Sequence, residues 1–205
     1  MKKKLDECED GSVAQRFCLA VLQKLSIKDS VTLQIYQENF HCWVLGLLER
    51  GAQGLRKDAK TPEIHAFCLD FSSALLANVF HNGAVLDRLE KSSQMLAETL
   101  QKLLALLKEN LPTSVLIHLL ICLSYLSKER FSHVLEEVHF VERISDFVEW
   151  FTLKHPDSQK QNVSERKTVL DLCAHMFHPK DASQDMSGTM EYNEIKQEER
   201  IKEFE

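Results

Sequence analysis

The sequence is poor in the residues that interrupt regular secondary structure. Its 205 residues include 6 glycines and 4 prolines, which argues against a loop-rich β protein because such folds need many turn residues. No segment shows the strict apolar–polar alternation that is typical of a half-buried strand. Apolar side chains recur at helical spacing instead, so we expect an all-α protein.

The sequence also lacks an excess of positive charge and a long apolar run. A net charge of −6 provides no electrostatic basis for binding nucleic acid or an anionic membrane. The most apolar run, residues 115–126, is too short to span a bilayer and contains His118. Three N-terminal lysines lead into acidic residues and not into a secretory apolar segment. We therefore expect a soluble, cytoplasmic protein that inserts into no membrane and binds no nucleic acid.

Paired cysteine spacing is absent as well. The 6 cysteines are widely separated, none forms a CxxC pair, and most lie among apolar helical residues. This pattern is typical of buried free thiols in a reducing compartment. The cysteines are Cys8, Cys18, Cys42, Cys68, Cys122 and Cys173.

Helical periodicity covers the chain from about residue 11 to residue 178, which we expect to be one helical domain. Residues 1–10 are charged and expected to be frayed, and residues 179–205 are expected to form an acidic, largely disordered tail. Gly51 is expected to end a helix and to begin a polar loop over residues 51–60. The expected helices span residues 12–25, 29–36, 40–48, 61–83, 83–90, 92–110, 113–126, 131–138, 140–153 and 163–177.

The stretch from Thr61 to Gly83 carries the clearest helix signals. Thr61 is a suitable N-cap residue ahead of Pro62, and Asn82-Gly83 is a stop signal. Apolar residues form two strips between these ends, and Asn78 interrupts one of them. A helix that is apolar on two sides is expected to be buried between neighbouring helices.

Four similar segments recur along the chain at a period near 50 residues. Their starts are 54, 47 and 50 residues apart, and the order of a short helix followed by a longer one recurs with them. This period predicts an armadillo-like α-solenoid of about four irregular repeats, with helices 62–80 and 115–126 in its interior. Chance similarity among apolar helices is the alternative. The segments are AVLQKLS (20–26), ALLANVF (74–80), ICLSYLS (121–127) and DLCAHMF (171–177).

The sequence ALLANV at residues 74–79 resembles the third helix of an armadillo repeat. Together with VLQKLS (21–26), QENFHCWVLGLLE (37–49) and CLDFSSALLANV (68–79), it resembles the C-terminal armadillo region of the LisH and armadillo-repeat proteins of the ciliary base, which are associated with Joubert-type ciliopathy. The resemblance spans residues 12–150. It implies a non-enzymatic scaffold at centrioles, basal bodies and cilia, with a role in ciliary stability and Hedgehog signalling. The LisH motif and coiled coil of that family have no counterpart in this sequence.

One column of the aligned segments supplies the candidate partner-binding residues, Lys24, Asn78, Tyr125 and His175. In armadillo proteins this column faces a concave groove, where asparagines bind the backbone of an extended peptide. A single asparagine among four positions disfavours a general peptide groove of the importin or catenin kind. The alternative is that Asn78 satisfies a neighbouring backbone group and that the others are surface residues.

Candidates for catalysis or metal binding are weaker. Cys173 and His175 point about 160° apart on a helix, so they cannot share an ion with His178 unless the helix ends there. His41-Cys42 suggests a thiol nucleophile, but no nearby acid orients the pair, and a buried cysteine beside a surface histidine is the expected arrangement. The acids Asp58, Glu63 and Asp70 are expected to be isolated on the surface, and Trp43 and Trp150 are expected to be core anchors.

These observations together favour a protein-interaction scaffold without enzymatic activity, cofactor, metal or small-molecule substrate. Its expected partners are other proteins, centriolar or ciliary ones, and its expected location is the cytoplasm and the cytoskeleton of the basal body. A cytoplasmic adaptor unrelated to cilia is the first alternative. A thiol- or metal-dependent hydrolase is the second, and it requires a cleft that joins Cys42 or Cys173 to a histidine and an acid.

Overall fold

The computed structural model describes Leu5, Cys8 and residues 12–57, 62–109, 111–155 and 163–177. These residues form helices and connecting turns without any strand, which confirms the all-α class. The helices are α2 (Val13–Leu25), α3 (Asp29–Gln37), α4 (Phe40–Lys57), α5 (Pro62–His81), α6 (Gly83–Glu90), α7 (Ser93–Leu106), α8 (Thr113–Leu126), the 3₁₀ helix η1 (Glu129–Phe131), α9 (Ser132–Glu137), α10 (Phe140–Lys154) and α11 (Val163–Phe177).

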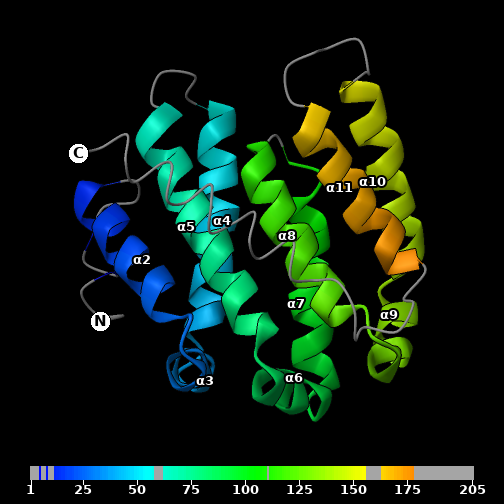
Figure 1. Ribbon diagram of the computed structural model, residues 1–205, viewed down its shortest axis with the longest axis horizontal. Coiled ribbons are helices and arrows are strands. Elements are labelled where there is room, and N and C mark those ends of the chain that lie inside the picture. The colour runs from blue at the N-terminus through cyan, green and yellow to red at the C-terminus, as the bar shows by residue number, and fades with distance from the viewer. Residues whose placement is uncertain are drawn as a thin grey trace.

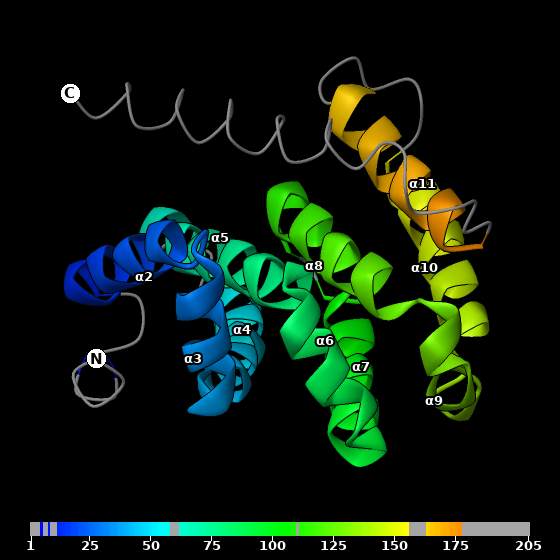
Figure 2. The same ribbon diagram turned by 60° about the horizontal axis from the view of Figure 1, so that its bottom comes forward.

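Four of the helices, α2, α5, α8 and α11, form a front row in Figure 1. Within it, α5 packs between α2 and α8, and α8 packs between α5 and α11. The predicted side-by-side order of these four helices is therefore confirmed. A second row of α4, α7 and α10 lies behind the first, and the short helices α3, α6 and α9 lie at one end of both rows. The turned view in Figure 2 shows α2, α5 and α8 above α3, α4, α6 and α7.

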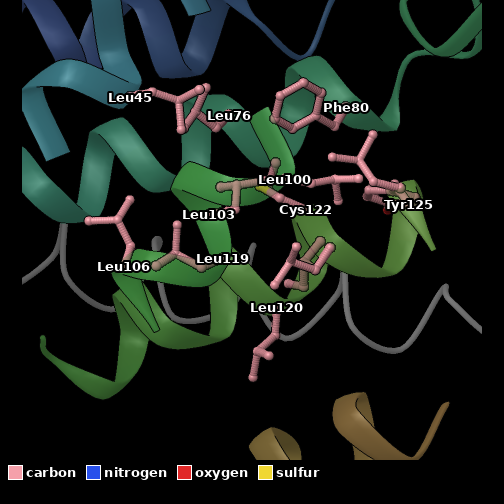
Figure 3. Close-up of a cluster of buried hydrophobic side chains, with 14 of the residues drawn as sticks. Leu45, Leu76, Phe80, Leu100, Leu103, Leu106, Leu119, Leu120, Cys122 and Tyr125 are labelled. Atoms are coloured by element: carbon pink, nitrogen blue, oxygen red, sulfur yellow. The ribbon is translucent and has the colours of Figure 1, made fainter. Parts of the chain in front are cut away.

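The core lies between the two rows. In α8, 11 of the 14 residues are buried, because the helix is enclosed by α5, α7 and α11. Figure 3 shows Leu76 and Phe80 from α5 close to the side chains that α7 and α8 contribute. Burying one such side chain contributes about 1.5–3 kcal/mol. Leu5, in the segment that the sequence predicts to be frayed, is 1% exposed and joins this core.

Two equivalent turns introduce the long helices α4 and α10. Asn39 and His139 immediately precede Phe40 and Phe140, and each adopts a left-handed backbone with φ of 53°. In both turns the left-handed residue donates its backbone N–H to the carbonyl three residues earlier, at 3.0 Å. The two turns therefore share their backbone conformation, and a phenylalanine follows each of them.

Gly51 does not end a helix, so the prediction of a loop from this residue onwards is wrong. Helix α4 continues through Gly51 to Lys57. A Cβ atom at Gly51 would overlap Leu69 Cδ2 and lie 3.3 Å from Leu69 Cγ. Glycine is therefore present because α5 approaches α4 closely at this point, and its low helix propensity is overridden by packing.

We expect Gly51→Ala to lower the free energy of unfolding by about 1 kcal/mol. Alanine favours the helix by about 1 kcal/mol, but overpacking against buried Leu69 costs about 1–3 kcal/mol. Gly46→Ala in the same helix is the matched control. Its Cβ would lie 3.5 Å from Arg50 Nη1, an ordinary contact, so it should gain about 0.5–1 kcal/mol. Denaturant unfolding of both variants measures the difference, and an equal gain in both would contradict the close approach.

Candidate functional site

The candidate partner-binding column lies on the four helices of the front row, one residue on each. Lys24 is on α2, Asn78 on α5, Tyr125 on α8 and His175 on α11. Because these helices are neighbours, the structure places the four residues in the order that the repeat alignment predicts. Lys24 and His175 are exposed, whereas Asn78 is half-buried and Tyr125 is buried.

Asn78 connects α5 to the C-terminal end of α2. Its side-chain amide donates to the backbone carbonyl of Gln23 at 3.3 Å and to Ser26 Oγ at 2.9 Å. The Ser26 hydroxyl in turn donates to the same Gln23 carbonyl at 2.6 Å. The last carbonyls of a helix have no partner within it, so the asparagine amide satisfies one of them. The sequence analysis left open the alternative that Asn78 satisfies a neighbouring backbone group, and its contact with the Gln23 carbonyl is of that kind.

Tyr125 makes a similar connection one helix further along the row. Its hydroxyl lies 3.0 Å from Nδ1 of His81, the last residue of α5, and the two rings are 5.1 Å apart. Burial raises the pKa of the Tyr125 hydroxyl, and the neighbouring Cys122 raises it further. Both inner members of the column therefore contact the end of the preceding helix, and its two outer members, Lys24 and His175, project into solvent.

Asn82 is a structural residue whose role the sequence did not reveal. Helix α5 ends at His81, as the stop signal predicts, but Asn82 caps α6. Its Oδ1 accepts from the backbone N–H groups of Ala84 and Val85, at 3.0 and 3.3 Å. Its Nδ2 donates to Thr32 Oγ1 at 2.7 Å and to the Asp29 carbonyl at 3.2 Å. The predicted cap at the other end of α5, Thr61, lies outside the described residues.

Three polar side chains connect α5 to α8: Asp70 and Ser73 on α5 and His118 on α8. Ser73 Oγ lies 3.0 Å from His118 Nδ1, and Asp70 Oδ1 lies 3.9 Å from the same nitrogen. The Asp70 side chain is 15% exposed, so the prediction that it is an isolated surface acid is wrong. A catalytic triad needs the acid and the hydroxyl on opposite ring nitrogens. Here both face one nitrogen, and Ser73 is fully buried, which is the arrangement of a helix-linking contact.

The burial expected for His41 and Cys42 is reversed in the structure. His41 is fully buried and stacks on Tyr36 with ring centres 4.6 Å apart, whereas Cys42 is exposed. The Cys42 Sγ lies 3.4 Å from His41 Nε2. Desolvation lowers the pKa of His41 to about 4. An imidazole with so low a pKa is a poor base for a thiol near neutral pH, so the contact does not amount to an activated nucleophile.

The remaining candidates behave as structural groups. Cys173 is buried, and burial raises the pKa of its thiol to about 12. Within the described ranges, no three histidine, cysteine or acidic residues gather as a metal site would require, and His178 lies outside them. Trp43 and Trp150 are half-buried against the core, next to Phe40 and Phe147.

A cleft of about 360 Å³ opens where α8 leads into α9. Leu135, Phe140, Val141 and Met176 provide an apolar lining. The carboxylate side chains lining the cleft come from Glu136 and Glu142, and Ser127 and Ser132 add two hydroxyls. The cleft can accept an apolar side chain that is accompanied by a positive charge. Neither Cys42 nor Cys173 contributes to its lining.

The chain matches no known family profile, no curated protein and no solved structure. Among the helices that the structure describes, none combines the length and the apolar character needed to cross a membrane.

We expect Asn82→Ala to lower the free energy of unfolding by about 2–3 kcal/mol. The variant loses the α6 cap, which contributes about 1 kcal/mol. It also loses the two hydrogen bonds that Nδ2 donates to Thr32 Oγ1 and the Asp29 carbonyl, which together contribute about 1–2 kcal/mol. Ser92→Ala is the control, because Ser92 occupies the N-cap position of α7 without a capping side-chain hydrogen bond. Denaturant unfolding should change by less than about 0.5 kcal/mol for this control. Equal losses would contradict the bridging role of Asn82.

We also expect His41 to make the protein sensitive to mild acid. Its folded-state pKa of about 4 is below the ordinary value of 6.5, so its contribution to stability is complete above about pH 6.5 and is lost as the pH falls towards 4. Between about pH 7.5 and 5 the loss amounts to about 2 kcal/mol. Unfolding at both pH values should show this difference for the natural chain and for the exposed control His175→Gln, and it should largely disappear in His41→Phe. A pH dependence that His41→Phe leaves unchanged would contradict the assignment.

Proposed function

We propose that this chain is an armadillo-like α-solenoid of about four irregular repeats that serves as a protein-interaction scaffold. The observation that carries the proposal is the front row of α2, α5, α8 and α11. Each of these helices carries all or all but the last residue of one of the four similar sequence segments, and each packs against the next in chain order. Stacking of equivalent helices in chain order is the defining geometry of a solenoid.

The helices between the members of the row support the same proposal. A short helix and then a long helix precede α5, α8 and α11 in turn, as α3–α4, α6–α7 and α9–α10. The left-handed turn before α4 recurs before α10 at Asn39 and His139. Single repeats of this kind cannot bury their own apolar faces, so stacking is required for their stability.

The function of such a stack is to present extended surfaces to other proteins without chemical turnover. Lys24 and His175 offer exposed polar side chains at the two ends of the candidate column. The cleft beside Phe140 and Met176 offers a recess for an apolar anchor, and such anchors contribute strongly to the affinity of protein interfaces. Both features lie on rigid helices, which reduces the entropy that binding must offset.

The proposed setting is the centriole or the base of the cilium, with partners among the proteins of these structures. Its support is the resemblance of residues 21–26, 37–49 and 68–79 to the armadillo region of the ciliary LisH proteins. On this proposal the chain contributes to cilium assembly or stability and to ciliary Hedgehog signalling. A cytoplasmic adaptor unrelated to cilia would have the same fold, so the setting has to be tested separately from the scaffold role.

Proximity labelling with the full chain fused to a biotin ligase in ciliated cells tests both parts. We expect enrichment of basal-body proteins, and we expect His175→Glu to reduce the labelling of direct partners several-fold because it places a negative charge at an exposed contact position. Ala174→Glu is the matched control, since it places the same charge about 100° around the same helix. Labelling spread evenly over cytosolic proteins would refute the ciliary setting. Loss of the same partners in both variants would refute the assignment of His175 to the interface.

A further inference from the structure

The face of α2 that points away from the core carries an apolar stripe. Val13, Phe17, Val21 and Leu25 recur every fourth residue and are 53%, 62%, 49% and 41% exposed, and Ile27, just past the helix, is 66% exposed. Among the residues that the structure describes, these are five of the eight large apolar side chains left exposed. We call these five residues the α2 face. Contiguous exposed apolar surface of this kind marks interaction sites.

The α2 face lies at an end of the front row. The buried residues of α2, which include Leu19 and Leu22, lie on the opposite side of the helix, and α2 packs against α5. The helices α5 and α8 have neighbours in the row on both sides, whereas the described residues place α5 on one side of α2 (Figure 1). The α2 face therefore occupies the position where another helix of the same kind would continue the row.

The other end of the row has a different chemistry. Helix α11 exposes Ser164, Lys167, Asp171 and His175, and Val163 is its one exposed large apolar side chain. A polar outer face of this kind terminates a helical stack in water. The exposed side of α2 is apolar instead. A role as the water-facing end of the stack therefore does not explain it.

Positive charge surrounds the stripe. Residues 12–28 contain Arg16, Lys24 and Lys28 and no acidic residue. Lys24 and Lys28 are exposed, and Lys24 projects from the same side of α2 as Phe17 and Val21 because the three are separated by three, four and seven residues. Arg16 lies over the Phe67 ring at 4.5 Å. The helix therefore combines an apolar stripe with an exposed lysine on the same side, and a second exposed lysine follows just past its end.

We infer that the α2 face binds an acidic amphipathic helix of another protein, an inference that rests on the proposed scaffold function and names the class of partner. Apolar residues of this helix, spaced three or four apart, pack between Phe17, Val21 and Leu25 along about 12 Å of α2. Its acidic residues pair with Lys24 and Lys28. A second copy of this chain fits less well, since two α2 helices would bring like charges together across the apolar seam.

A synthetic helix tests the inference with the full chain. The probe has leucines along one face and glutamates on the other, and its twin has lysines in place of the glutamates. We expect the acidic helix to bind at least about tenfold more tightly than the basic twin, and we expect Phe17→Ser combined with Val21→Ser to weaken its binding by at least about tenfold. Lys24→Glu should reduce or reverse the preference for the acidic helix. Fluorescence anisotropy measures each affinity.

The control variant replaces exposed apolar residues elsewhere, as Leu153→Ser on α10 combined with Val163→Ser on α11. It should bind the acidic helix as the natural chain does. Because the replaced side chains are exposed in both double variants, their circular dichroism and unfolding midpoints should stay close to those of the natural chain. Equal loss of binding in both, or equal affinity for the acidic and basic helices, would overturn the inference.

Two further outcomes would assign the α2 face to a different occupant. A dimer seen by sedimentation, which Phe17→Ser combined with Val21→Ser converts to monomer, would identify a second copy. Binding that appears only after the glutamates of residues 191–205 are changed to glutamines would identify the acidic segment of the chain itself. If the synthetic helix fails to bind while His175→Glu still removes labelled partners, this inference fails and the scaffold proposal stands.

Discussion

The structure depends on one constraint, the need of α8 to be enclosed on nearly every side. Its residues from Val115 to Leu123 are all buried, and water contact along such a surface would cost far more than the marginal stability of a domain. Enclosure requires α5 and α11 beside α8 and α7 behind it. The connections before α5, α8 and α11 then have to return the chain to the same end of the row, which the short and long helices between them accomplish.

Apolar packing alone does not determine how far neighbouring helices slide along one another, because leucine-rich surfaces fit in several registers. Polar contacts between helices restrict this freedom. Asn78 reaches the end of α2, Tyr125 reaches the end of α5, and the Ser73 and His118 side chains join α5 to α8. A shift by one helical turn would separate each pair and leave buried polar atoms without partners. The polar residues inside the apolar row thus favour a single register.

The sequence predicted those features that depend on local spacing and failed where a residue acts through a distant one. Helices α8 and α11 have the predicted limits, because apolar periodicity and flanking prolines define them. The role of Gly51 depends on Leu69 in the next helix, and the link from Asn82 to α3 depends on Thr32 and Asp29, so neither could be deduced from neighbours in the chain. The candidate column was predicted in its order along the row. Asn78 and Tyr125 point inward because they contact the preceding helix. The spacing of the repeated segments carried no information about these contacts.

On the scaffold proposal, the difference between the two ends of the row bears on how the stack would acquire partners. A polar terminal helix such as α11 ends the burial of apolar surface, and the chain gains solubility there. The stripe on α2 leaves apolar side chains exposed, and covering about four large side chains yields several kcal/mol before the entropy of association is offset. The positive charge around this stripe then selects among helices that could cover it. On this proposal, the apolar packing that joins the helices of the row would also recruit the partner helix. Charge would then provide the specificity that chain connectivity provides within the row.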